Sequence, residues 1–250
     1  MTIRSRALST LFPLLLLLPA VTFAEAPAPA PGKQVEQQFS SGTLSVGYLL
    51  FLPKDYSPDG KPSPLMLFLH GAGERGSGNL ELVKKHGPPK IVEKKPGFRF
   101  IVVSPQCPKG QRFDTRLLSA LLDEITKKYH VDRKRVYVTG LSMGGSGTWA
   151  LANAEPGRFA AIVPICGLAP IEPKRFRSLS TWVVVGGKDR PQLVESLKQT
   201  VERLKKTKAP VRFTLHPELG HDSWTVTYND PKLYKWLLEQ TNRGPLPRRD

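Results

Sequence analysis

The chain has 250 residues, of which 40% are apolar and 8% aromatic, and its formal net charge is +16. A chain of this length forms one large domain more often than two, and its apolar content is sufficient for a core, which excludes a globally disordered protein. Two cysteines are too few for a disulfide-rich scaffold. No apolar run reaches the roughly 20 residues of a membrane span, which excludes a polytopic membrane protein.

Residues 1–24 have the pattern of a signal peptide. Arg4 and Arg6 precede the almost entirely apolar stretch 11–23, which is short for a membrane span but has the length of a signal-peptide core. Thr22 and Ala24 fit the positions that a signal peptidase reads, so we expect cleavage after Ala24 and a secreted or periplasmic protein without stable membrane insertion. An uncleaved anchor is the alternative.

The rest of the chain divides into three parts. Residues 25–36 are rich in proline and alanine and are expected to form a semi-rigid tether. Residues 37–243 are expected to form the folded domain, and residues 244–250 a basic tail. No internal repeat and no insertion long enough for a second domain is visible.

The large positive charge does not predict a nucleic-acid partner. Lysines occur in scattered pairs rather than in one stripe, and no zinc-finger, RNP or helix-turn-helix signature accompanies them. An exported protein also seldom meets nucleic acid. We expect a solvated basic surface, with attraction to an anionic envelope or polysaccharide as the alternative.

Within the expected domain, strand patterns alternate with helix patterns. Short apolar runs predict strands, and apolar residues at helical spacing predict helices. The predicted strands are a hairpin within 38–53, then 64–70, 100–104, 135–139, 160–165, 182–185 and 211–215. The predicted helices are 117–129, 144–154, 193–204 and 233–238. This alternation predicts an α/β fold with a mostly parallel sheet covered by helices on both faces.

A G-x-S-x-G sequence at residues 140–144 lies directly between a predicted strand and a predicted helix. In that context the glycines allow a strained turn that lifts the Ser142 hydroxyl clear of the sheet. The helix N-terminus then favours the negative charge that develops when a serine attacks a carbonyl. We therefore predict Ser142 as a nucleophile, whereas a glycine-rich turn with an incidental serine is the alternative.

A serine nucleophile needs a base, and the base needs a carboxylate that orients it. Of the five histidines, His221 follows the last predicted strand at the same sheet edge as Ser142, whereas His86 and His130 lie among lysines in expected surface segments. Between Ser142 and His221, Asp189 is the acidic residue that directly follows a strand. The order Ser, Asp, His is the order of the α/β-hydrolase fold.

A glycine-rich loop at residues 70–76 follows the strand 64–70, where a loop supplying one oxyanion-hole N–H is expected. The second N–H belongs to Met143, the residue after the predicted nucleophile. The loop does not fit a phosphate-binding loop, because it lacks the Gly-Lys-Ser/Thr ending.

Together these motifs resemble the α/β-hydrolase superfamily, in its compact secreted branch. That branch includes polyhydroxybutyrate-depolymerase-like, feruloyl-esterase-like and dienelactone-hydrolase-like proteins, and carboxylesterases often labelled predicted peptidases of the prolyl oligopeptidase type. The matching stretches are LHGAGERG (69–76), KHGPPK (85–90), SPQCP (104–108), GLSMGG (140–145), PICG (164–167) and GHDSW (220–224). The resemblance implies a sheet of about eight strands without a large cap domain.

The resemblance also implies roles for individual residues. Ser142 corresponds to the nucleophile, Asp189 to the acid, His221 to the base, and Ala72 with Met143 to the oxyanion donors. The segment around Asp189 departs from relatives, which usually carry His-Gly before the acid and a Val-Val-Pro run after it. Asp189 is the expected acid, and Glu218 is the next acid to test.

Two further features have alternative interpretations. Cys107 and Cys166 both follow strands at the expected active-site edge and could form a disulfide, although the strand order of this fold would separate them. Trp224 is a possible wall of the substrate pocket, with plain packing as the alternative.

The function expected from these residues is an exported serine carboxylesterase that cleaves small-molecule or polysaccharide-linked esters through an acyl-enzyme. That mechanism requires no metal and no organic cofactor. A serine peptidase of the prolyl oligopeptidase type is the alternative, although peptide-cleaving relatives usually carry an additional propeller domain. A non-catalytic surface or binding protein is a third hypothesis, which the complete set of triad residues disfavours.

Overall fold

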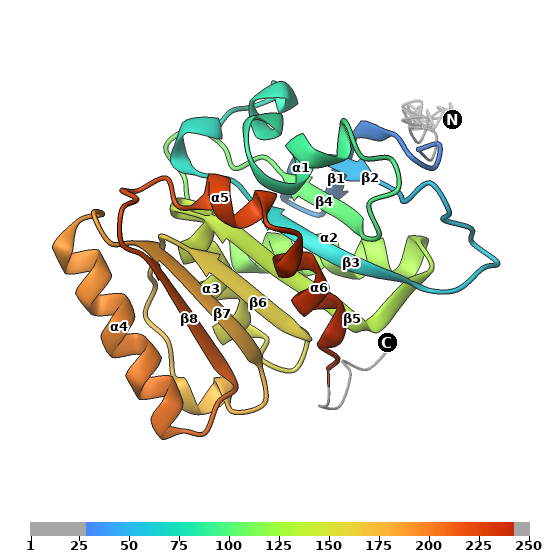
Figure 1. Ribbon diagram of the computed structural model, residues 1–250. Coiled ribbons are helices and arrows are strands. Elements are labelled where there is room, and N and C mark those ends of the chain that lie inside the picture. The colour runs from blue at the N-terminus through green and yellow to red at the C-terminus, as the bar shows by residue number, and fades with distance from the viewer. Residues whose placement is uncertain (1–28, 243–250) are drawn as a thin grey trace, which may run out of the picture.

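An eight-stranded sheet runs through the middle of the molecule, in a computed structural model that describes residues 29–242 (Figure 1). The strand order is β1-β2-β4-β3-β5-β6-β7-β8. The strands are β1 (Gln34–Ser41), β2 (Leu44–Phe51), β3 (Ser63–Leu69), β4 (Ile101–Pro105), β5 (Val131–Leu141), β6 (Ala161–Ile165), β7 (Ser180–Gly186) and β8 (Val211–His216).

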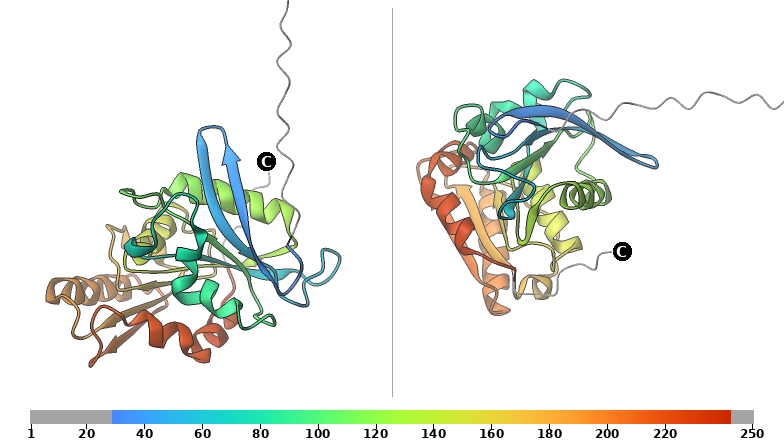
Figure 2. Two further views of the ribbon diagram at one scale, coloured as in Figure 1. Left: turned by 90° about the horizontal axis from the view of Figure 1, so that it is seen from above. Right: turned by 90° about the vertical axis from the view of Figure 1, so that its right-hand side faces the viewer.

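The sheet is parallel except at one end. β1 and β2 form an antiparallel hairpin, and β2 is also antiparallel to β4. The strands from β4 through β3 to β8 are parallel neighbours. Parallel strands end at the same edge of a sheet, so the loops after β3, β5, β6, β7 and β8 meet there. The hairpin projects beyond the body of the molecule (Figure 2).

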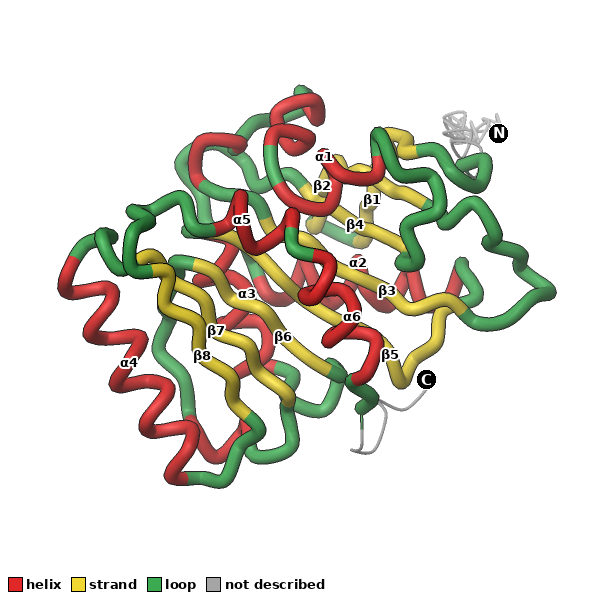
Figure 3. Tube along the Cα trace, viewed as in Figure 1, coloured by secondary structure: helices red, strands yellow, loops and turns green. Residues whose placement is uncertain are grey.

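Helices cover both faces of the sheet, as the secondary-structure colouring makes clear (Figure 3). The α-helices are α1 (Gly87–Val92), α2 (Thr115–Lys128), α3 (Met143–Ala154), α4 (Pro191–Lys206), α5 (Trp224–Asn229) and α6 (Pro231–Glu239). Three short 3₁₀ helices are η1 (Ala72–Glu74), η2 (Leu80–Lys85) and η3 (Pro173–Phe176). One layer contains α2 and α3, and the other contains α1, α5 and α6; α4 lies over β7 and β8 and contacts η3.

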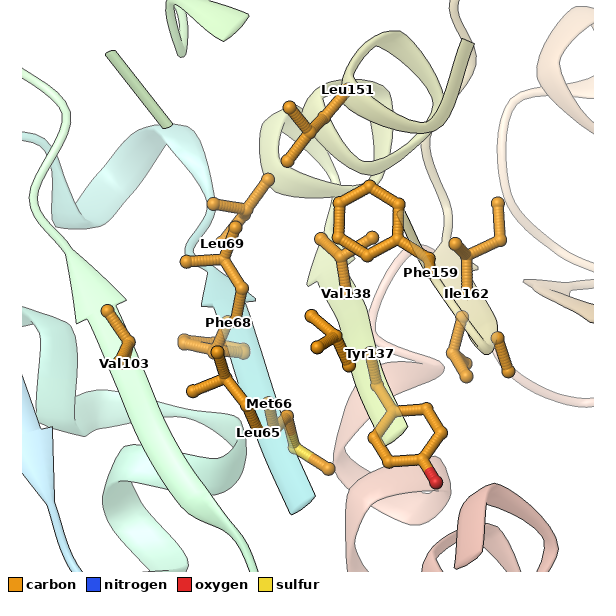
Figure 4. Packing of buried hydrophobic residues seen from close by; sticks show 14 of the residues in the cluster. Leu65, Met66, Phe68, Leu69, Val103, Tyr137, Val138, Leu151, Phe159 and Ile162 are labelled. Atoms are coloured by element: carbon orange, nitrogen blue, oxygen red, sulfur yellow. The ribbon is translucent and has the colours of Figure 1, made fainter. Parts of the chain in front are cut away.

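The core is formed by the central strands and the helices that pack on them. Leu65, Leu67 and Leu69 of β3 are fully buried, and so are Met66 and Phe68, which point to the opposite face. Figure 4 shows the side chains of Leu65, Met66, Phe68 and Leu69 near Val138 and Leu151. Strands buried on both faces are characteristic of parallel sheets, which explains their continuous apolar sequences.

The expected α/β architecture is confirmed, and the described residues contain no large cap domain. The first strand begins at Gln34, earlier than expected and inside the range given to the tether, because the antiparallel pairing with β2 continues to the Gln34–Phe51 pair. The sequence patterns missed α1, α5 and the 3₁₀ helices, which are too short to display a helical repeat. None of the described helices has the length and apolarity that crossing a membrane requires.

The predicted signal peptide 1–24 and the predicted tail 244–250 lie outside the described residues, as do the first residues of the predicted tether.

Candidate active site

Ser142 lies in a strained turn between β5 and α3. Its φ is +51° and its ψ is −112°, a conformation that non-glycine residues rarely adopt. The turn is held by hydrogen bonds from the Ser142 N–H to the Ile165 carbonyl and from the Ser146 N–H to the Ser142 carbonyl. This is the sharp strand-to-helix turn that the sequence predicts, and it places the hydroxyl at the carboxyl edge of the sheet.

Gly144 makes this turn possible, because the chain leaving it passes close to β3. A Cβ atom on Gly144 would lie 1.8 Å from the Leu69 carbonyl oxygen and 2.7 Å from the His70 carbonyl oxygen. No side chain can be accommodated at such distances. The glycine therefore lets α3 start directly beside the loop that follows β3.

Ser142, His221 and Asp189 form one continuous hydrogen-bonded row. The Ser142 Oγ lies 2.9 Å from His221 Nε2, and His221 Nδ1 lies 2.7 Å from Asp189 Oδ2. The Asp189 side chain is almost fully buried, whereas that of His221 is 39% exposed. The second carboxylate oxygen of Asp189 accepts a hydrogen bond from the Arg190 N–H at 2.7 Å, which holds the carboxylate in place.

The loops after β7 and β8 bring His221 to Asp189. The Lys188 N–H donates to the Leu219 carbonyl, and the Gly187 N–H donates to the His216 carbonyl. Glu218, the other acid that the sequence left open, is exposed and pairs with Lys188 instead. The geometry therefore selects Asp189 as the acidic partner of His221.

The loop after β3 lies next to the turn that carries Ser142. Ala72 opens η1 and Met143 opens α3. Backbone N–H groups in the first turn of a helix have no acceptor within that helix. The N–H groups of Ala72 and Met143 can therefore both donate hydrogen bonds to an oxygen atom of a bound molecule. A Cβ on Gly71 would lie 2.7 Å from the Leu141 side chain, the residue before Ser142, so the two segments are in direct contact.

His70 anchors this loop and is itself no candidate base. Its Nδ1 lies 2.6 Å from the Gly71 carbonyl oxygen, and its Nε2 accepts a hydrogen bond from the Cys107 N–H at 2.9 Å. Because the Cys107 amide can only donate, the ring is neutral, with its proton on Nδ1. Burial lowers the pKa of His70 from 6.5 to about 4.

We expect this buried imidazole to make folding stability depend on pH. Below pH 6.5 the unfolded chain protonates His70 while the folded chain does not, until about pH 4. The contribution of the neutral His70 to the free energy of unfolding is therefore fully present above pH 6.5. It falls as the pH is lowered, by about 2 kcal/mol at about pH 5. Urea unfolding of the wild type and of His70→Gln, above pH 6.5 and at about pH 5, measures this contribution. Between these two conditions the free energy of unfolding should fall by about 2 kcal/mol more in the wild type than in His70→Gln. The same pH dependence in both proteins would contradict a neutral, buried His70.

Cys107 and Cys166 are both buried and free, so the disulfide considered from the sequence is not formed. Cys107 follows β4 and Cys166 follows β6, with β3 and β5 between them. Three inter-strand spacings amount to roughly 14 Å, whereas a disulfide requires Cα atoms within about 7 Å. Cys166 Sγ instead lies 2.9 Å from Ser223 Oγ, which joins the end of β6 to the loop that carries His221.

One group of potential metal ligands occurs among the described residues. Cys166, Asp189 and His221 offer ligand atoms within 4.8 Å of one another. The Asp189 and His221 atoms are already hydrogen-bonded to each other, and burial raises the pKa of the Cys166 thiol, which disfavours the thiolate that a metal needs. The donor set therefore fits a hydrogen-bonded triad better than a metal centre.

Trp224, for which the sequence left a pocket wall and plain packing as alternatives, lies against His221, and His86, which the sequence patterns did not single out, lies against Trp224. The rings of Trp224 and His221 meet edge to face at 5.3 Å between centroids, and those of Trp224 and His86 at 5.8 Å. The neighbouring lysines suggested a surface segment, but His86 is one-third exposed and contacts the loop of His221 through Trp224. The KHGPPK stretch (85–90), which contains His86, was the feature of the sequence that could have indicated its place at the site.

The strand order, the turn at Ser142 and the hydrogen-bonded row of Ser142, His221 and Asp189 define an α/β-hydrolase. The profile of the dienelactone hydrolase family matches residues 37–232. The chain belongs to the dienelactone hydrolase family.

Individual proteins similar to this chain include esterases. A bifunctional acetylxylan esterase/xylanase of Neocallimastix patriciarum is 30% identical over 125 residues, which are 47% of this chain and 17% of that protein. The crystal structure of a thermostable esterase is 30% identical, with a TM-score of 0.71 over 85% of this chain and 64% of that one. The chain thus spans less than two thirds of either protein.

A feruloyl esterase module from Clostridium thermocellum, solved with sinapinate, is similar in fold alone. It is 16% identical, with a TM-score of 0.63 over 92% of this chain and 98% of that module.

Proposed function

We propose that this protein is a serine hydrolase of the carboxylesterase type. The observation that carries the proposal is the row of hydrogen bonds from Ser142 through His221 to Asp189, at 2.9 and 2.7 Å. In this row a base is within reach of the hydroxyl proton, and a buried carboxylate holds the base in one tautomer.

The proposed reaction begins when Ser142 Oγ attacks the ester carbonyl while its proton moves to His221 Nε2. The negative charge on the carbonyl oxygen is stabilised by the N–H groups of Ala72 and Met143. His221 then donates the proton to the leaving alcohol, which breaks the ester bond and leaves an acyl group on Ser142. A water molecule, deprotonated by His221, releases the acid and restores the serine.

The substrate class that we propose is carboxylic esters, either small or attached to a polysaccharide. The support is the 30% identical relative named as an acetylxylan esterase/xylanase, together with membership in a family of hydrolases. The 39% exposure of the His221 side chain is compatible with a leaving group that extends into solvent.

We expect esters to be hydrolysed much faster than amides. An alkoxide leaves with little assistance, whereas an amine must be protonated by His221 and requires binding energy from remote parts of the substrate. The measurement is kcat/KM for an ester and an anilide with the same acyl group. If kcat/KM for the anilide is within tenfold of that for the ester, the two activation barriers differ by less than ~1.4 kcal/mol. That result would favour the serine peptidase over the esterase as the function of the protein.

We also propose that the protein is exported, with the mature chain starting at Glu25. The support is the charged and apolar pattern of residues 1–24. N-terminal sequencing of the secreted protein would test it, and an intact N-terminus on membrane-bound protein would favour an anchor.

A further inference from the structure

The carboxylate of Glu74 is buried within the loop that supplies the proposed oxyanion donor. Glu74 is the last residue of η1, which Ala72 opens, and its side chain is 10% exposed. The side chain folds back over Gly71, where a Cβ would lie 2.9 Å from Glu74 Oε2. A buried carboxylate is costly unless a cation or hydrogen-bond donors accompany it.

His86 is the basic group beside this carboxylate. In the part of the chain that the structure describes, His86 is the only basic residue with a nitrogen within 4 Å of the Glu74 carboxylate, with 3.9 Å between Nε2 and Oε1, and the two form an ion pair when the imidazole is protonated. The position of His86 is well defined, because it precedes Gly87, whose φ is +63° and where a Cβ would lie 2.5 Å from the Phe68 ring. Two prolines follow in α1 and further restrict the backbone.

His86 in turn contacts the loop that carries His221. The Trp224 ring contacts the rings of both His86 and His221 edge to face. The indole Nε1 of Trp224 is buried and has no acceptor among the described residues. Packing therefore sets the position of this ring, rather than a hydrogen bond.

We propose that Glu74 and His86 are positioning residues for the reaction at Ser142. The contact between the Glu74 carboxylate and the His86 imidazole, an ion pair when the ring is protonated, fixes η1, and hence the Ala72 N–H, relative to His221, so that the oxyanion donor and the base stay aligned in the transition state. This inference rests on the proposed function. It assigns a role to the KHGPPK motif and to Glu74 in the LHGAGERG motif, neither of which the triad uses.

The charge pairing can be separated from ring packing by two substitutions at one position. His86→Phe keeps an aromatic ring against Trp224 but removes the basic nitrogen that faces Glu74, whereas His86→Arg places a cation near Glu74 but removes that ring. If the pair positions η1, His86→Phe lowers kcat about tenfold or more and His86→Arg stays closer to the wild type. This loss is smaller than the roughly 10²–10³-fold cost of deleting an oxyanion donor outright.

Glu74→Gln provides an independent test, because it keeps the shape and removes the charge. We expect kcat to fall about as in His86→Phe with KM within about twofold, and the double variant to be no slower than the slower single variant, since residues that act as a unit are not additive. Affinity for a trifluoromethyl ketone, whose adduct carries the oxyanion, should fall by the same factor as kcat/KM.

The matched control is Glu81→Gln. Glu81 also pairs with a basic residue, Lys84 at 2.6 Å, but lies on η2 and is exposed, so kcat should not change. Thermal unfolding and stoichiometric labelling of Ser142 by a fluorophosphonate show that each variant is folded. Wild-type kcat in His86→Phe, or a larger loss in His86→Arg than in His86→Phe, would overturn the proposal.

The outcomes also distinguish this inference from the proposed function. An inactive Ser142→Ala protein together with fully active Glu74 and His86 variants would refute only the positioning role. Activity that survives in Ser142→Ala would refute the serine mechanism itself.

Discussion

Replacing Ser142 with alanine is expected to lower kcat by about 10⁶-fold, the size of effect that loss of the nucleophile has in other serine hydrolases. The Oγ at 2.9 Å from His221 Nε2 is the only atom of this residue that can form the acyl-enzyme, and alanine lacks it. Turnover of a p-nitrophenyl ester and labelling by a fluorophosphonate should disappear together.

Ser77→Ala is the control for this variant. Ser77 is exposed on the loop that follows η1, so its loss should change neither turnover nor labelling. Labelling that persists in Ser142→Ala would place the nucleophile elsewhere.

Replacing Asp189 with asparagine is expected to lower kcat by about 10⁴-fold without unfolding the protein. The carboxylate oxygen 2.7 Å from His221 Nδ1 accepts a hydrogen bond from the Nδ1–H and so leaves Nε2 unprotonated and able to act as a base. An asparagine amide that donates to Nδ1 instead would stabilise the tautomer with its proton on Nε2, which cannot accept the proton of Ser142. Steady-state kinetics measure the effect, and thermal unfolding checks the fold.

Glu218→Gln is the matched control for the acid. Glu218 lies on the same loop as His221 but is exposed and paired with Lys188, so kcat should stay near the wild-type value. Near-normal activity in Asp189→Asn, with a loss in Glu218→Gln, would move the acidic role to Glu218.

Local sequence patterns were sufficient to predict the central strands and the turn at Ser142. Buried parallel strands are continuous apolar runs, and β3, β4, β6, β7 and β8 appear within a residue or two of their predicted ranges. The G-x-S-x-G turn depends on residues next to one another in the chain, so its conformation could be predicted from them. α1 and α5 have six residues each, fewer than two turns, and therefore carry no readable periodicity.

Distances between separate loops could not be predicted in this way. The sequence favoured Asp189 as the acid, with Glu218 as the next to test, and the packing of the loops after β7 and β8 puts Asp189 beside His221 and Glu218 in solvent. Two cysteines at one sheet edge could have been bridged, and the two intervening strands keep them apart.

The sequence by itself determined the fold class, the turn at Ser142 and the short set of residues that could act with it. Each of these depends on neighbours in the chain, through hydrophobic periodicity, glycine conformation and the order of the strands. Only the tertiary structure shows the contact between the expected acid, Asp189, and His221. It alone also shows that His86, which the sequence placed in a lysine-rich surface segment, lies against Trp224 and Glu74. Those contacts join segments far apart in the chain, so they depend on the packing of the whole sheet and its loops, which no local pattern encodes.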